Sequence, residues 1–269
     1  MRRKLLFITL ALVFCSSIQA RGLAEGDMKN IGYDQHIGQQ ISPGLTFEDS
    51  TAGKVALSDL WNKKPTLLVL GYYQCPMLCT LINDGMIGAL QELRFDVGRD
   101  FNVVNVSIDP DERPKLAADK KKEYLTRYGR AGAARGWHFL TGDQQSITQL
   151  ANDAGFRYKY DPELRQFAHP SGFIVLTPDG RISRYFFGVN FAPAELRSAI
   201  IAASNGQEGS VIKNLILLCC QYNPITGKYG ALIMTVLRAA GIGTVVLLGW
   251  GIVRMCRRGP GDAAGTEAS

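Results

Sequence analysis

Unbroken apolar runs mark the strands that the chain is expected to form. Residues 66–70 (TLLVL) and 101–109 (FNVVNVSID) are rich in β-branched and aliphatic side chains without alternation, which is typical of strands buried on both faces. Residues 137–142 (WHFLTG) predict a third, short strand. Residues 173–187 predict a hairpin, because two β-rich runs flank a Pro-Asp-Gly turn.

Apolar residues at helical spacing separate these strands. One such stretch starts at Thr80 and continues to Leu93. Further helices are expected over residues 115–128, 144–154 and 192–203. The basic run 120–122 is expected on the solvated face of its helix, and Ser58 is expected to cap a helical turn. The order β, α, β, α, β, α, β, β, α predicts an α/β fold, a sheet with parallel strands covered by helices on both faces.

The two ends of the chain differ from this middle part. Residues 1–20 have three basic residues, an apolar run and small residues up to Ala20, which predicts a secretory signal peptide. Residues 230–253 are apolar with one charge, Arg238, and predict a transmembrane helix with a cytoplasmic tail at 254–269, since basic residues follow it at once. A buried amphipathic helix is the alternative. The soluble part is then expected in the periplasm, tethered to the inner membrane.

Charge narrows the range of partners. The chain has a formal net charge of +6, and most of the excess lies in the signal segment and beside the predicted membrane helix. The part between them is nearly neutral, so the sequence does not indicate nucleic-acid binding.

Two cysteines follow the first predicted strand. Cys75 and Cys79 are separated by three residues, and Pro76 suits the first turn of a helix. At a strand-to-helix junction the helix dipole and unpaired N–H groups favour a thiolate, and the two side chains can point the same way. Such a pair indicates a redox disulfide or a site for a soft metal; two buried structural cysteines are the alternative.

The three histidines are not equivalent. His36 lies in an irregular lead-in over residues 21–43, and His138 falls inside a short strand, where a structural role is expected. His169 lies in a loop before the hairpin, a position that would face the cysteine helix in a thioredoxin-like order. Two thiolates and one imidazole suit copper or zinc, and thiolate ligation selects Cu(I).

Several motifs together resemble one family. CPMLC (75–79), VSIDP (106–110), WHFLTG and His169, nine residues before the Pro-Asp-Gly turn, are similar to those of the Sco/SenC family. Its members are thioredoxin-like copper chaperones, tethered to the membrane and used in assembling the binuclear copper centre of cytochrome c oxidase subunit II. The resemblance implies a thioredoxin-like domain with a central mixed sheet over residues 44–204, and copper bound by Cys75, Cys79 and His169.

Some features depart from the family pattern. Pro170 follows the histidine, where it could reorient the ring of His169. The predicted anchor is at the carboxyl end, after a linker over residues 205–229. That linker contains the adjacent Cys219 and Cys220. They are expected to form a strained vicinal disulfide, to act as extra ligands or resolving thiols, or to be ordinary apolar residues.

Two functions remain open. The first is copper delivery to subunit II of the oxidase or a similar membrane protein. The second is a thiol-disulfide oxidoreductase, in which Cys75 attacks and Cys79 resolves without any metal. A peroxidase and a copper or redox sensor are weaker alternatives, and His169 separates copper chemistry from pure thiol exchange.

Overall fold

The computed structural model describes residues 30–75, 78–208, 240–241, 243–245 and 247–254. The chain divides into two compact units, Met1–Asn214 and Leu215–Ser269. The predicted signal peptide lies outside the described residues, as do most of the predicted linker, the first part of the predicted membrane helix (residues 230–239) and most of the tail. Residues 240–254 are helical where the structure describes them. No helix within the described ranges is both long and apolar enough to cross a bilayer.

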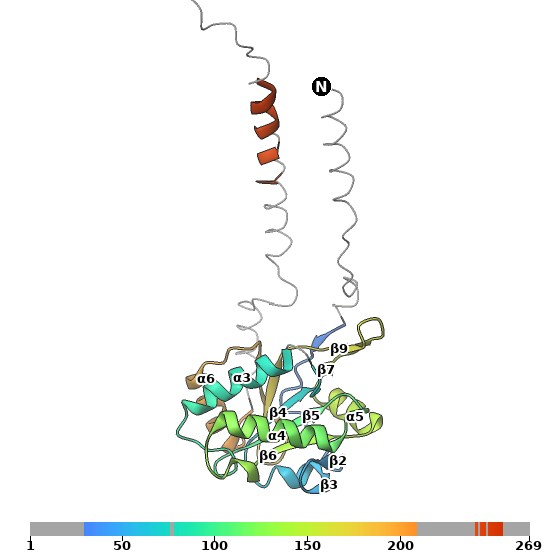
Figure 1. The fold of residues 1–269 in the computed structure, drawn as a ribbon. Helices are drawn as coiled ribbons and strands as arrows, with labels where there is room; N and C mark the ends of the chain where they lie inside the picture. The colour runs from blue at the N-terminus through green and yellow to red at the C-terminus, as the bar shows by residue number, and fades with distance from the viewer. Residues whose placement is uncertain (1–29, 76–77, 209–239, 242, 246, 255–269) are drawn as a thin grey trace, which may run out of the picture. The chain divides into compact units, whose positions relative to one another are not determined.

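The first unit is built on a seven-stranded sheet (Figure 1) with the order β11-β10-β4-β5-β6-β2-β3. Its centre consists of β4 (Thr66–Gly71), β5 (Asn102–Ser107) and β6 (Trp137–Thr141), which pair in parallel. The neighbouring pairs on either side are antiparallel. The sheet is therefore mixed, which confirms the expected α/β class and the central mixed sheet.

Further strands complete the described structure. Four of them extend the central sheet: β2 (Thr46–Asp49), β3 (Gly53–Ala56), β10 (Gly172–Leu176) and β11 (Ile182–Phe187). Four more form two small antiparallel pairs: β1 (Gly32–Tyr33) with β7 (Phe156–Arg157), and β8 (Lys159–Asp161) with β9 (Gln166–Ala168). The predicted hairpin around the Pro-Asp-Gly turn is confirmed as β10 and β11.

The apolar run of β4 serves two cores at once. Because successive side chains of a strand point to opposite faces, Leu67 and Val69 pack into one core and Leu68 and Leu70 into the other. All four are almost completely buried. This explains why the run has no polar alternation.

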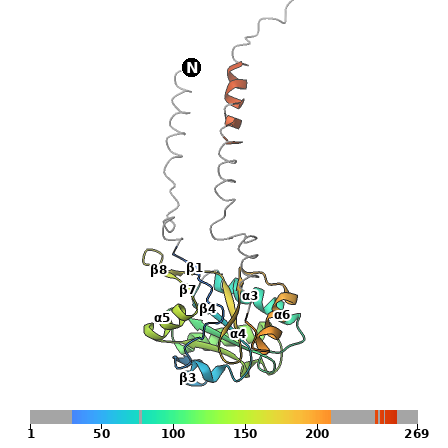
Figure 2. The ribbon, with the colours of Figure 1, turned by 180° about the vertical axis from the view of Figure 1, so that it is seen from behind.

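Helices cover both faces of the sheet (Figures 1 and 2). The core on one face contains residues of α3 (Leu78–Gln91), α4 (Pro114–Tyr128) and α6 (Pro193–Ser204). The other core contains residues of α5 (Gln144–Asp153) and the 3-10 helix η1 (Leu57–Leu60). A second 3-10 turn, η2 (Ala133–Arg135), precedes β6. The layered arrangement matches the expectation from the order of elements.

Two local predictions were wrong. Ser58 does not cap η1, whose N-cap is Ala56 with no side-chain hydrogen bond. Lys121 is buried and donates to Thr51 Oγ1 at 3.1 Å, because it lies on the inner face of α4 rather than the solvated one.

Candidate metal centre

Cys75 lies in a tight turn at the carboxyl end of β4. Its N–H donates to the carbonyl oxygen of Tyr72 at 3.3 Å, so residues 72–75 form a turn with Tyr73 and Gln74 at its centre. Cys75 is partly buried and packs against the core that contains Tyr72. α3 begins at Leu78, which confirms the predicted strand-to-helix junction.

Cys79 is the second residue of α3, on the first turn of the helix. Its side chain, like residues 76 and 77, is outside the described part of the chain. Among the side chains that the structure describes, no three from His, Cys, Asp and Glu are grouped closely enough to hold a metal. The pairing of Cys79 with Cys75 and His169 is therefore a prediction from the sequence.

His169 lies between β9 and β10 and is 6% exposed. Its ring contacts those of Tyr72 and Phe156, with centroid separations of 5.9 Å and 6.1 Å. Its Nδ1 is 3.0 Å from the carbonyl oxygen of Pro170. Since a carbonyl only accepts, Nδ1 carries a proton, and in the neutral ring the lone pair is then on Nε2.

The register of the sheet explains why these segments meet. β10 is antiparallel to β4, with Ile174 opposite Leu68 and Leu176 opposite Thr66. The start of β10 therefore lies beside the end of β4. The residues just before β10, including His169, and those just after β4, including Cys75, therefore lie toward the same edge of the sheet. Both His169 and Cys75 contact Tyr72.

Aromatic rings surround this edge. Phe167 of β9 contacts Tyr72, Tyr158 and Tyr160, with centroid separations of 5.6 Å, 5.9 Å and 5.0 Å. The short β8–β9 pair thus packs on Tyr72 and leads directly into His169. Such packing restrains the loop that carries the histidine.

Glu112 is a residue of this edge that the sequence did not reveal. It is 5% exposed, and three donors reach its carboxylate: Tyr73 N at 2.8 Å, Gln74 N at 2.7 Å and Ser107 Oγ at 2.6 Å. Burial raises the pKa of Glu112, although these hydrogen bonds act in the opposite direction. Asp109, the acidic residue of the VSIDP motif, instead accepts from Asp111 N at 2.9 Å within its own loop.

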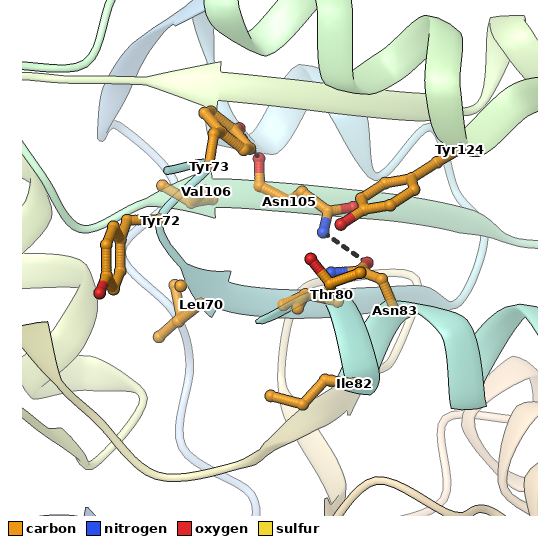
Figure 3. A pocket seen from close by; sticks show the side chains of 11 residues that line it. Leu70, Tyr72, Tyr73, Thr80, Ile82, Asn83, Asn105, Val106 and Tyr124 are labelled. Atoms are coloured by element: carbon orange, nitrogen blue, oxygen red, sulfur yellow. Dashed lines mark hydrogen bonds between the residues drawn. The ribbon is translucent and has the colours of Figure 1, made fainter. Parts of the chain in front are cut away.

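A polar network lies beneath the first turns of α3, around a cavity of about 20 Å³ (Figure 3). Asn105 of β5 donates to Asn83 of α3 at 2.9 Å and accepts from Trp137 Nε1 at 2.9 Å. The hydroxyl of Tyr73 donates to Leu140 O at 2.8 Å, and burial raises its pKa well above the ordinary value. A cavity of this size holds about one water molecule. The network fixes α3 one turn after Cys79.

The other two histidines make structural contacts. His138 Nδ1 lies 2.8 Å from the buried carboxylate of Asp49, which confirms the structural role expected for it. His36 Nδ1 lies 3.2 Å from the carbonyl oxygen of Asp153.

A family model described as SCO1/SenC matches residues 39–204 of the chain. The chain belongs to the SCO1/SenC family. The match covers every described strand of the central sheet and the segments that carry Cys75, Cys79 and His169.

Two individual proteins are similar to this chain at about a quarter identity. A SCO1 protein homolog of Bacillus subtilis (strain 168) is 26% identical over 166 residues, covering 58% of this chain and 82% of that protein. A putative electron transfer protein from Aquifex aeolicus VF5 is 25% identical, with a TM-score of 0.56, and the similarity covers 64% of this chain and 95% of that one.

Two further kinds of Sco structure are similar. BsSco, a member of the Sco family of cytochrome c oxidase assembly proteins with an identified disulfide switch, is 25% identical, with a TM-score of 0.50, and 65% of this chain and 98% of that one are covered. Sco structures with copper bound also match, at 17% to 21% identity with TM-scores of 0.45 to 0.48. Their copper is a property of those proteins.

Proposed function

We propose that this protein binds copper through Cys75, Cys79 and His169 and delivers it during assembly of cytochrome c oxidase. The observation that supports the proposal is that Cys75 and His169 both contact Tyr72: Cys75 N donates to Tyr72 O, and the imidazole of His169 packs against the ring of Tyr72. Cys79 lies on the first turn of the helix that follows. Subunit II of the oxidase, or a similar copper-receiving membrane protein, is the proposed recipient.

The chemistry of the donors supports copper. Two thiolates select Cu(I), and an imidazole adds a donor that also suits Cu(II). The contact between His169 Nδ1 and Pro170 O supports ligation through Nε2, because the partner of one ring nitrogen fixes the tautomer of the other. Pro170, a departure from the family pattern, thus supplies an orienting carbonyl rather than displacing the histidine.

The similarity to BsSco supports the setting of this function, since that protein is a member of a family of cytochrome c oxidase assembly proteins. We further propose that residues 1–20 are a signal peptide and that residues 230–253 anchor the domain 44–204 to the inner membrane, with residues 254–269 in the cytoplasm. The linker over residues 205–229 would then hold the domain near a membrane-bound recipient, which raises its effective concentration there.

The test is copper stoichiometry and the absorption spectrum of residues 21–210, a fragment that keeps most of the first compact unit and omits Cys219 and Cys220. The reduced fragment is loaded without oxygen with Cu(I), and separately with Cu(II). We expect one tight copper with a thiolate-to-copper charge-transfer band. Cys75→Ser should abolish this site, and His169→Ala should weaken it about 10- to 100-fold for at least one oxidation state.

His138→Ala is the matched control, because His138 contacts Asp49 away from this edge. The proposal is wrong if the fragment binds no copper that depends on Cys75. The role of His169 is wrong if its variant binds both oxidation states as tightly as the wild type does.

A second candidate is a thiol-disulfide oxidoreductase that reduces cysteines of the oxidase without transferring metal. The disulfide switch of BsSco favours it. It predicts a readily exchanged Cys75–Cys79 disulfide and turnover that His169→Ala leaves unchanged. Retained turnover in that variant, with no tight copper in the wild type, would select this function over copper delivery.

A further inference from the structure

We propose that Glu112 is a positioning residue of the copper site: its buried carboxylate fixes the turn 72–75 and thereby sets where Cys75 lies relative to His169. This inference rests on the proposed function. It adds a residue outside the proposed ligand set, from the loop between β5 and α4.

The turn 72–75 is fixed from two sides. Its ends are joined by the hydrogen bond from Cys75 N to Tyr72 O, and both central N–H groups, of Tyr73 and Gln74, donate to Glu112. Consecutive N–H groups that converge on one anion form a backbone nest. In a solvated turn such groups bond to water and leave the turn free to change conformation.

The carboxylate of Glu112 is itself held in place by its neighbours. Ser107, the last residue of β5, donates to Glu112 Oε2, and the N–H of Glu112 donates to Asp109 O at 3.3 Å. α4 starts at Pro114, only two residues further on. Glu112 is therefore held between the end of a central strand and the start of a long helix.

Both halves of the proposed ligand set depend on this turn. Tyr72, its first residue, packs its ring against the imidazole of His169, and Cys75 is its last residue. A rotation of the turn would move the thiol and the ring that supports the histidine at the same time. Residues that orient metal ligands in this way affect metal affinity without touching the metal.

The positioning role of Glu112 and its negative charge predict opposite effects of Glu112→Gln on copper binding. A carboxylate close to a thiolate pair repels it, so loss of the charge alone would favour the copper-bound form. Glu112→Gln removes the charge and also puts an NH₂ group in place of one accepting oxygen, which leaves an N–H of the turn facing a donor. If position dominates, Glu112→Gln weakens copper binding; if charge dominates, it strengthens it.

The experiment uses the full chain in detergent and measures the Cu(I) affinity of the site that Cys75→Ser abolishes, by competition with a chromophoric chelator. We expect Glu112→Gln to lower this affinity about 10- to 100-fold and to shift the charge-transfer band of the Cu(II) form. Asp111→Asn is the matched control, since it removes the same charge from an exposed position of the same loop. It should leave both unchanged.

Two more measurements keep the proposal falsifiable. Ser107→Ala keeps the hydrogen bonds from Tyr73 N and Gln74 N to Glu112 and removes only the one from Ser107 Oγ. It should therefore lower the Cu(I) affinity by a smaller factor, and it can be measured even if Glu112→Gln folds poorly. Amide hydrogen exchange of the copper-free protein should be faster at Tyr73 and Gln74 in Glu112→Gln than in Asp111→Asn. Equal exchange in these two variants, or unweakened copper binding in folded Glu112→Gln, overturns the proposal.

If the proposed copper-binding function is wrong, the measurements give a different result. In that case the wild type has no copper site that depends on Cys75. The positioning role is then decided by amide exchange together with the rate at which the Cys75–Cys79 pair exchanges with glutathione. A rate changed in Glu112→Gln but not in Asp111→Asn would support it, and equal rates would refute it.

Discussion

Two glycines of the cysteine helix α3 should respond in opposite directions to the same substitution. Glycine lowers the stability of a helix by about 1 kcal/mol relative to alanine, so helix propensity alone predicts that both Gly85→Ala and Gly88→Ala stabilise the protein. The surroundings differ. A Cβ added at Gly85 would lie 1.8 Å from the carbonyl oxygen of Val189, whereas one at Gly88 would meet nothing within 4 Å.

The clash at Gly85 is with backbone, so either α3 or the segment that contains Val189 has to move. Overpacking of this kind costs about 1 to 3 kcal/mol, which exceeds the gain in helix propensity in most of that range. We expect Gly85→Ala to lower the free energy of unfolding by about 1 to 2 kcal/mol. Gly88→Ala should raise it by about 0.5 to 1 kcal/mol.

Urea unfolding followed by circular dichroism measures both changes, and thermal unfolding should show shifts of about 2 to 4 °C for each kcal/mol in a unit of this size. The matched pair shares one helix and one substitution, so a common effect on the unfolded chain cancels. If Gly85→Ala is as stabilising as Gly88→Ala, the close contact between α3 and Val189 is refuted.

Three other variants test particular contacts. Asp49→Asn should lose about 2 kcal/mol at neutral pH; although burial acts to raise the pKa of Asp49, the hydrogen bond to His138 and those from its own loop lower it. Because the folded pKa is below the unfolded one, this difference should shrink as the pH falls below about 4, as unfolding from pH 7 to pH 2 would show. Tyr73→Phe removes the buried hydroxyl that donates to Leu140 O and should cost about 1 kcal/mol in urea unfolding; an unchanged midpoint would contradict this. Gly180→Ala should destabilise and alter Trp61 fluorescence, since φ is +83° and the new Cβ would lie 2.3 Å from that ring; an unaltered spectrum would contradict the contact.

The sequence predicted those parts of the fold that have a recognisable pattern of apolar or turn residues over consecutive positions. The strand over residues 66–70 was predicted because both faces of a central strand need apolar side chains. The hairpin over residues 173–187 was predicted because two β-rich runs flank a Pro-Asp-Gly turn. The strands β1, β7, β8 and β9 have two or three residues each, too few for any period to show. Their pairing is set by partners far along the chain.

The burial of Lys121 was not predicted for a different reason. It falls on the stripe Ala117, Lys121, Tyr124 and Tyr128, the helical spacing of the inner face of α4. Because residues 120–122 were interpreted as one exposed charged run, this helical spacing was overlooked. Its long aliphatic stem suits the buried position, and its ammonium group reaches Thr51 Oγ1.

The site combines local and distant determinants. The spacing of Cys75 and Cys79 is local, and their place at a strand-to-helix junction follows from the residues around them. The positions of Glu112 and His169 depend on the topology of the sheet. Glu112 follows β5, which is parallel to β4. His169 precedes β10, which is antiparallel to β4. A parallel neighbour contributes the residues after its end and an antiparallel neighbour those before its start, so both reach the edge where β4 ends. The histidine was found in the sequence because its residue type suggested chemistry, whereas a glutamate in an acidic loop gave no such signal until the sheet register placed it under the turn.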